Sequence, residues 1–141
     1  MEVKIVRKEA PAAEDVRVIY EGLKNFNRES CGDADVKSLV LALQDPETGA
    51  TVGGLQAHAF YGWLYISLVF VPENLRGNNY GTRLMADAET WAIEQGLTRI
   101  WLDTYSFQAP GFYEKCGFEL FGSLPDFPPG HSRQYYRKML K

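Results

Sequence analysis

Residues 51–71 contain no Asp, Glu, Lys or Arg, and this stretch constrains the fold more than any other feature of the sequence. An uncharged run of about 18 or more residues is ordinarily a candidate for a membrane-spanning helix. This run, however, contains Gly53, Gly54, Gly62, Gln56 and His58 among β-branched and aromatic residues. That composition favours two buried strands, at residues 50–60 and 63–71, joined by a tight turn at Tyr61 and Gly62. We therefore expect no membrane span.

Hydrophobic periodicity and turn residues predict the other elements. Apolar positions spaced three and four residues apart predict helices at residues 14–26 and 80–95, the second closed by Gly96. A short helix is expected at residues 109–116. Strands are expected at residues 2–8, 36–44, 99–104, 118–124 and 132–140, with a loop or a brief helical turn at 27–35 and a hairpin turn at 45–49. The order βαβββαβαββ predicts one α/β (α+β) domain with a mixed sheet that spans residues 1–141.

Composition and charge exclude several classes of protein. The chain has 141 residues, is 45% hydrophobic and carries a net charge of −3, which is typical of one folded globular domain. Its Lys and Arg residues are spread along the sequence, so we expect neither nucleic acid nor a membrane as a partner. The N-terminus lacks the apolar segment of a signal peptide, and Cys31, Cys116 and the two histidines lack the spacing of metal ligands. We expect a cytoplasmic protein with reduced thiols and no metal.

The strongest functional signal lies between the second buried strand and the long helix. Residues 72–82 form a turn rich in Gly and Asn, which would expose backbone N–H groups at the positive end of the helix dipole. Such helix N-termini bind phosphate oxygens, and Arg76 adds a positive charge beside them. The segment matches neither the P-loop pattern nor the three-glycine dinucleotide pattern. The alternative interpretation is that Gly77 and Gly81 serve only the turn and the packing.

Two motifs resemble segments of the GNAT N-acetyltransferase superfamily. Its pyrophosphate loop, with the pattern Gln/Arg-x-x-Gly-x-Gly/Ala, is similar to Arg76-Gly77-Asn78-Asn79-Tyr80-Gly81. Its Asn-x-x-Ala-x-x-Phe-Tyr-x-x-x-Gly-Phe segment is similar to Ser106-Phe107-Gln108-Ala109-Pro110-Gly111-Phe112-Tyr113-Glu114-Lys115-Cys116-Gly117-Phe118. The predicted order of elements extends the likeness over most of the chain, which looks like a branch of small bacterial GNAT proteins.

The resemblance implies acetyl-CoA as cosubstrate and direct attack on its thioester by a primary amine of a small molecule or peptide. It also implies that amides at the end of the strand at 63–71 polarise the thioester carbonyl, while the loop holds the pyrophosphate. The coenzyme-binding residues that it implies are Leu68, Val69, Val71, Arg76, Gly77, Asn78, Asn79, Tyr80, Gly81, Thr82, Ser106, Phe112 and Tyr113. Tyr113 matches the tyrosine that donates to the leaving thiolate, the alternative being a packing role beside Phe118.

Two positions depart from the family pattern. Asn79 stands where glycine is usual, and Asn is the residue with a side chain that best tolerates a left-handed backbone. Ser106 stands where Asn is usual and keeps a donor with a shorter reach. The strand at 63–71 also lacks the carboxylate that many relatives use as a base. The candidates for that role are Ser67, His58 and Asp103, or a chain of waters. For each of these residues the alternative is a structural role, as a polar side chain whose hydrogen bonds are satisfied within the protein.

These departures leave other hypotheses open. One is a non-catalytic acyl-CoA-binding or sensing module, and another is a structural interaction domain that uses its aromatic residues as a contact face. For assembly, we expect a homodimer in which the aromatic late strand, residues 134–139, pairs at an exposed sheet edge or packs between copies.

Overall fold

The computed structural model describes residues 1–140 and divides the chain into two compact units, Met1–Ala34 and a second unit that begins at Asp35. The first unit holds one helix, α1 (Ala13–Cys31). Its apolar side chains recur at helical spacing: Val16, Ile19, Tyr20, Leu23 and Phe26. The helix ends at Gly32, whose φ of +79° reverses the backbone. The helix predicted at residues 14–26 is confirmed, and it continues to Cys31, into the segment that was expected to be a loop or a brief helical turn.

The strand predicted at residues 2–8 is wrong. The structure assigns no strand among residues 1–12. A strand is defined by hydrogen bonds to a neighbouring strand, and the unit Met1–Ala34 contains no second strand among its described residues. Alternation of apolar and charged residues predicts an extended backbone, but it does not supply a partner.

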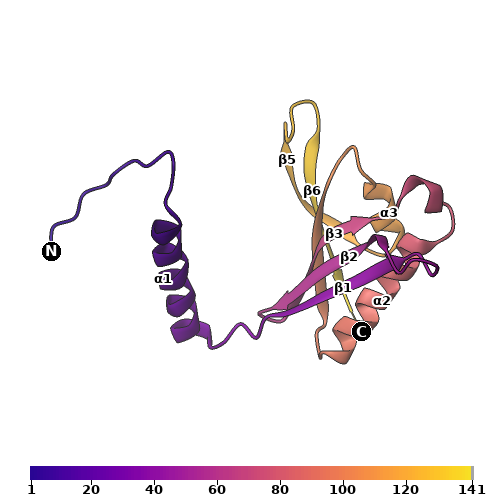
Figure 1. The fold of residues 1–141 in the computed structure, drawn as a ribbon, viewed down its shortest axis with the longest axis horizontal. Coiled ribbons are helices and arrows are strands. Elements are labelled where there is room, and N and C mark those ends of the chain that lie inside the picture. Colours follow the sequence, from indigo (N-terminus) through magenta and orange to yellow (C-terminus); the bar gives the residue numbers. More distant parts are fainter. Residues whose placement is uncertain (141) are drawn as a thin grey trace. The chain divides into compact units, whose positions relative to one another are not determined.

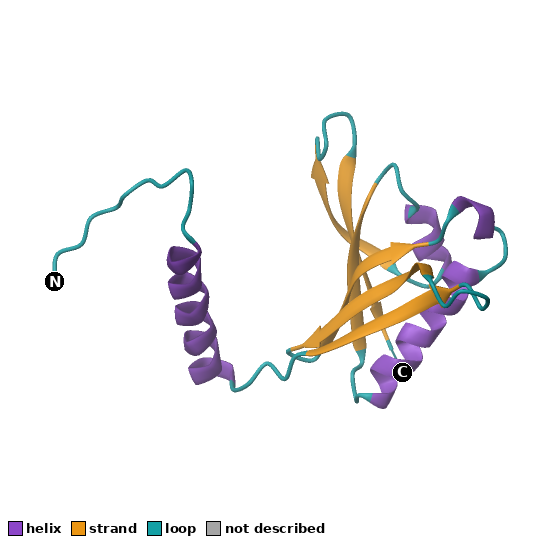
Figure 2. Cartoon of the chain, viewed as in Figure 1, coloured by secondary structure: helices purple, strands orange, loops and turns teal. Residues whose placement is uncertain are grey.

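The second unit contains the remaining elements, all near their predicted positions (Figure 1, Figure 2). In chain order they are β1 (Lys37–Gln44), β2 (Thr51–Phe60), β3 (Trp63–Phe70), the 3-10 turn η1 (Glu73–Leu75), α2 (Tyr80–Glu94), β4 (Arg99–Tyr105), α3 (Pro110–Lys115), β5 (Glu119–Pro125) and β6 (Ser132–Met139). The observed order therefore differs from the predicted one by the missing first strand and by η1.

The strands form one mixed sheet in the order β1-β2-β3-β4-β6-β5. Only the β3–β4 pair is parallel among the described strands, and the others are antiparallel. The predicted turn between β2 and β3 is present at Tyr61 and Gly62, whose positive φ values of 49° and 83° fit a two-residue type I′ turn. The expectation that residues 134–139 form an exposed edge is wrong, because β6 lies between β4 and β5. Sequence order does not reveal this insertion.

One face of the sheet carries the hydrophobic core. Helix α2 packs on it through Leu84, Met85, Ala88 and Ala92, which meet the buried side chains Leu55, Leu64, Ile66, Ile100 and Leu102 of the strands. Helix α3 contributes Phe112 and Tyr113 to the same cluster. Because side chains alternate along a strand, the residues between these core positions lie on the opposite face. Those residues include Tyr65, Trp101 and Asp103.

Candidate active site

A β-bulge at Ser67 changes the direction of β3 where the candidate site begins. Ala57 of β2 is opposite Ile66, and Gln56 is opposite Leu68, so Ser67 is the extra residue of β3. The Ser67 hydroxyl lies 3.2 Å from the Gln56 carbonyl oxygen and 3.2 Å from its Oε1. The side chain of this candidate catalytic residue is thus tied to β2.

The pairing between β3 and β4 ends at the bulge. Only three residue pairs join these strands, from Leu64 with Ile100 to Ile66 with Leu102. Beyond them, residues 67–70 of β3 have no partner on β4, so this side of the β3 backbone is open to a ligand. Leu68 and Val69, both implied as coenzyme contacts, lie in this unpaired segment, with Leu68 exposed and Val69 packed against the core.

The loop after β3 has the backbone that the phosphate-site prediction requires. Gly77 has a φ of +82°, and Asn79 is left-handed at φ 64° and ψ 16°. Asn is one of the few residues with a side chain that adopts this conformation readily, which explains how it replaces glycine here. The Asn78 side-chain amide donates to the carbonyl oxygen of Leu75 at 3.1 Å and braces the turn.

Helix α2 begins directly after this loop, at Tyr80, with its amide end open. Asn79 provides no side-chain cap, and the first turn contains no acidic residue. The first N–H groups of a helix lack partners within the helix and carry a partial positive charge. Thr82, in this first turn, is exposed. The start of α2 is therefore suited to receive an anion.

Arg76 is anchored at the base of the same loop. Its Nε donates to the carbonyl oxygen of Val71 at 2.9 Å, while the side chain as a whole is exposed. This bond leaves the two terminal nitrogens of the guanidinium for an anionic acceptor. No carboxylate forms an ion pair with Arg76 among residues 1–140. The charge is therefore held near the helix terminus and is not neutralised there.

Gly81 brings α2 and α3 together. A Cβ atom at this position would lie 3.2 Å from Cζ of Phe112, closer than most real contacts of this kind. Next to Phe112 lies Tyr113, whose ring is 5.2 Å from that of Phe112 and 6.3 Å from those of Phe118 and Tyr136. This packing holds Tyr113 on the same side of the sheet as the loop.

Tyr113 is a protonated phenol at neutral pH. Burial raises the pKa of Tyr113 to about 12, with smaller contributions from the Cys116 thiol and the Asp103 carboxylate. A phenol with such a pKa keeps its proton and donates a hydrogen bond. The side chain is therefore able to stabilise a thiolate that forms beside it.

On the opposite face, Asp103 joins two other strands. Tyr65 of β3 donates its hydroxyl proton to Oδ1 of Asp103 at 2.8 Å, and Arg133 of β6 donates from Nε to Oδ2 at 2.8 Å and from Nη2 at 2.5 Å. Both carboxylate oxygens of this candidate base are thus engaged. Burial and the bond to Asp103 raise the pKa of Tyr65 to about 12, and the bond to Asp103 also raises the pKa of Arg133.

His58, the other candidate base, lies next to this cluster on β2. It is the register partner of Tyr65, and its Nδ1 is 3.0 Å from the Ser38 hydroxyl. Ser106, which follows β4, is bonded to Ser132 at the start of β6. Its hydroxyl accepts from the Ser132 amide at 3.0 Å, and its own amide donates to the Ser132 carbonyl at 2.8 Å. The coenzyme contact implied for Ser106 stays a prediction.

The residues that sequence reasoning missed are Arg133 and the hydrogen-bonded role of Tyr65. Arg133 is far from both motifs in the sequence, and only the β4–β6 pairing brings it to Asp103. A signal was nevertheless present. Tyr65 and Asp103 alternate with buried apolar residues on two strands, and polar side chains at such positions indicate a shared polar face.

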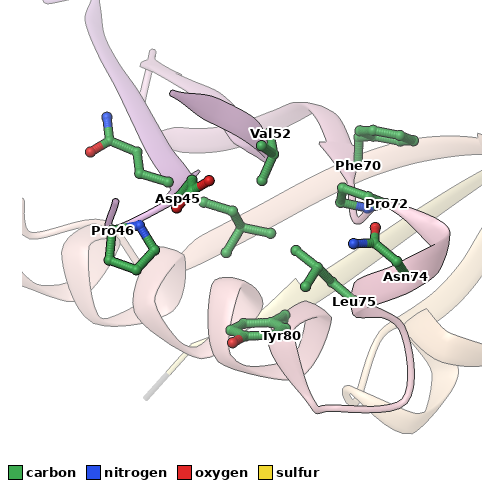
Figure 3. A pocket seen from close by; sticks show the side chains of 10 residues that line it. Asp45, Pro46, Val52, Phe70, Pro72, Asn74, Leu75 and Tyr80 are labelled. Carbon is green, nitrogen blue, oxygen red and sulfur yellow. The ribbon is translucent and has the colours of Figure 1, made fainter. Parts of the chain in front are cut away.

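A cavity of about 660 Å³ lies beside the loop, lined by the β1–β2 hairpin, the end of β3, η1 and the first turn of α2. Figure 3 shows Leu75 and Tyr80 at its α2 end and Pro46 on the hairpin. The cavity was not predicted, and Tyr65 is not among the residues that line it.

Two features are absent from the part of the chain that the structure describes. No group of three or more His, Cys, Asp or Glu side chains is placed to hold a metal ion. No helix there is long and apolar enough to cross a membrane.

Comparisons with known proteins extend this picture. A blasticidin-S acetyltransferase from Streptomyces morookaense is 44% identical over 85 residues, which are 60% of this chain and 62% of that protein, so the chain covers less than two thirds of this relative. The acetyltransferase Atu2258 of Agrobacterium fabrum (strain C58 / ATCC 33970) is 32% identical over 136 residues, or 96% of this chain and 98% of that protein.

Solved structures agree. An acetyltransferase from Bacillus cereus ATCC 14579 has a TM-score of 0.88 and 29% identity, and the match covers 96% of this chain and 98% of that one. A Bacillus anthracis str. Ames protein assigned as a streptothricin acetyltransferase, solved with acetyl coenzyme A, has a TM-score of 0.59 and 25% identity over 66% of this chain and 58% of that one. The sequence model of the acetyltransferase (GNAT) family matches residues 5–118. With its six-stranded mixed sheet and three helices, the chain belongs to the GNAT family of N-acetyltransferases.

Proposed function

We propose that this protein transfers the acetyl group of acetyl-CoA to a primary amine of a small molecule. The observation that carries the proposal is the open N-terminus of α2, preceded by a loop with left-handed backbone at Gly77 and Asn79 and adjoining an unpaired stretch of β3. The names of two similar proteins, a blasticidin-S and a streptothricin acetyltransferase, support an antibiotic-like amine as the acceptor.

In the proposed complex, the two parts of the site bind different parts of the coenzyme. The amides of residues 77–82 and the Arg76 guanidinium bind the pyrophosphate, because a helix N-terminus and a bidentate donor both favour phosphate oxygens. The pantetheine extends along residues 68–71 of β3, whose backbone lacks a β4 partner. Phe112 and Ser106 border the coenzyme from the α3 side.

In the proposed reaction, the amine nitrogen attacks the thioester carbonyl carbon, the C–N bond forms and the C–S bond breaks. Unpaired amides of β3 stabilise the oxyanion of the intermediate. Tyr113 donates a hydrogen bond to the departing sulfur. A thiol has a pKa of roughly 8.5 and Tyr113 one of about 12, so full proton transfer to sulfur would be uphill by about 5 kcal/mol. A hydrogen bond without full transfer is therefore the role that we assign to Tyr113.

The amine must also lose a proton during the reaction. Asp103 already binds Arg133 and Tyr65 with both oxygens, and the Ser67 hydroxyl is bound to Gln56, which leaves His58 as the better side chain for a base. Replacing His58 with Gln should lower the rate at saturating substrates. An unchanged rate across the pH range would instead favour a chain of waters.

The proposed function is tested by coupling binding to chemistry. Calorimetry should show saturable binding of acetyl-CoA, and mixing the complex with blasticidin S or a streptothricin should release free thiol and give a product heavier by one acetyl group. Tight coenzyme binding with no thiol release from any amine of a broad panel would overturn the transferase proposal in favour of a non-catalytic acyl-CoA-binding module.

We also propose a homodimer in the cytoplasm. Support for the dimer comes from β5, an edge strand of the sheet whose side chains Leu120, Phe121 and Leu124 are exposed. An exposed sheet edge that carries apolar side chains indicates an interaction surface. Cys31 and Cys116 are free thiols, which suits a reducing compartment. Light scattering that gives the mass of one chain at micromolar concentration would refute the dimer.

A further inference from the structure

The Tyr65 hydroxyl has a fixed direction. Asp103 is paired with Arg133 at 2.5 and 2.8 Å, and a carboxylate held in this way is ionised and has no proton to donate. The proton in the 2.8 Å bond between Tyr65 and Asp103 must therefore come from the phenol. Consequently, the Tyr65 oxygen offers only acceptor lone pairs to any other group.

The ring of Tyr65 is fixed as well. It stacks on Trp101 of the neighbouring strand with ring centres 4.1 Å apart and planes 18° from parallel. With the ring stacked and the hydroxyl bound, the acceptor oxygen has little freedom to rotate away. Preorganised acceptors of this kind orient a bound donor at small entropic cost.

Tyr65 also lies at the right place along the sheet. It precedes Ile66, where β3 and β4 stop pairing, and is two residues before the bulge at Ser67. Its side chain lies on the face opposite the core, while Tyr113 packs against the core on the other face. If Tyr113 contacts the sulfur, a nucleophile that reaches the carbonyl between the strands from the other side passes Tyr65.

We propose that Tyr65 positions the acceptor amine: its phenol oxygen, oriented by Asp103, accepts a hydrogen bond from one N–H of the amine. The inference rests on the proposed acetyl transfer and names an additional residue for it. A free primary amine has two N–H bonds and one lone pair, so holding one N–H directs the lone pair toward the thioester carbon. Tyr65 takes up no proton in this step. The acceptor is thereby a primary or secondary amine, and a tertiary amine, which lacks an N–H, is excluded.

Steady-state kinetics with blasticidin S as acceptor at saturating acetyl-CoA tests the inference. Tyr65→Phe keeps the ring and the stack, so we expect the KM for the amine to rise roughly 3- to 10-fold, the range for loss of one neutral hydrogen bond. The kcat should fall as well, because the lone pair is no longer directed toward the thioester carbon, while the affinity for acetyl-CoA should stay near wild type. The matched control is Tyr135→Phe, which removes a phenol hydroxyl from the register partner of Asp103 on the same face and should leave the KM unchanged.

A double-mutant cycle separates positioning from a structural role. In Asp103→Asn, the side-chain amide can donate to the phenol and turn the Tyr65 hydroxyl around, so the KM should rise although Tyr65 is present. If Asp103 acts through Tyr65, the rise in the double variant should not exceed the larger single rise. Additive effects, or equal KM values for Tyr65→Phe and wild type, would overturn the inference.

Failure of the proposed function gives a different result. If wild type binds acetyl-CoA but acetylates nothing, the affinity of blasticidin S is measured for each protein saturated with coenzyme A. This affinity then shows whether Tyr65 positions the amine. Weaker binding to Tyr65→Phe than to wild type and Tyr135→Phe supports the positioning role. Equal binding, or none to any of the three proteins, overturns it.

Discussion

The two adjacent asparagines of the coenzyme loop should differ in how strongly they respond to the same substitution. Asn79 has a φ of 64° and forms no capping bond, whereas Asn78 donates to the Leu75 carbonyl at 3.1 Å and is not among the positive-φ residues. Replacement by glycine therefore removes backbone strain at position 79 but removes a brace at position 78.

The expected sizes follow from these contacts. A left-handed backbone costs a residue with a side chain about 1–2 kcal/mol, and Asn less than most, so Asn79→Gly gains up to about 1 kcal/mol. The extra freedom of glycine in the unfolded chain costs about 0.5–1 kcal/mol, which nearly cancels the gain. At Asn78 the same entropic cost adds to a lost hydrogen bond of about 0.5–1.5 kcal/mol. Asn78→Gly should thus lose about 1–2.5 kcal/mol in all.

Two measurements check this pair. Denaturant unfolding gives the stability of each variant, and calorimetric titration with acetyl-CoA gives the affinity. For Asn79→Gly we expect both to stay within about 0.5 kcal/mol of wild type. For Asn78→Gly the loss should appear as a lower stability or as a weaker affinity, which reaches roughly 5- to 70-fold if the whole loss falls on binding. The division between the two depends on how ordered the loop is before the coenzyme binds. If Asn79→Gly loses as much as Asn78→Gly, the argument from backbone conformation is refuted.

Three further predictions concern the same site. Arg76→Ala should weaken acetyl-CoA binding by roughly 10-fold without unfolding the protein, because the side chain is exposed and is held by a hydrogen bond to the Val71 carbonyl; unchanged affinity in calorimetry would contradict a phosphate contact. Tyr113→Phe should lower kcat roughly 100-fold with little change in coenzyme affinity, and the wild-type rate should show no loss from phenol ionisation up to about pH 10, since the pKa of Tyr113 is raised to about 12. A variant as fast as wild type would remove Tyr113 from the mechanism. Gly81→Ala should displace Phe112, whose Cζ would lie 3.2 Å from the new Cβ, and lower the melting temperature, while Gly111→Ala, with open space around it, serves as the matched control.

The local parts of the fold were predictable and the non-local parts were not. The hydrophobic periodicity of residues 80–95 and the glycine after them predict helix α2. The uncharged stretch that contains Gly62 predicts the β2–β3 hairpin. The strand expected at residues 2–8 failed because alternation says nothing about a partner. The place of β6 inside the sheet was missed for a related reason, since strand order depends on long-range pairing.

In the candidate site, too, the local features were predictable and the non-local ones were not. The positive φ of Asn79 was expected from its place in the loop motif, because one residue determines its own backbone preference. The bulge at Ser67 depends on the register with β2, and the engagement of Asp103 depends on Arg133 thirty residues away along the chain. Sequence reasoning therefore found the residues of the loop but not the state of the polar groups on the opposite face.

The short parallel pairing between β3 and β4 has a consequence for how the sheet opens. Strands β1 to β3 form one antiparallel ladder and β4, β6 and β5 another, and three residue pairs join the two ladders. Local unfolding favours the places with the fewest hydrogen bonds, so amide hydrogens at this seam should exchange with deuterium sooner than those inside either ladder. A ligand that touches residues on both sides would act as a clamp across the seam and slow that exchange, because it binds only the closed state.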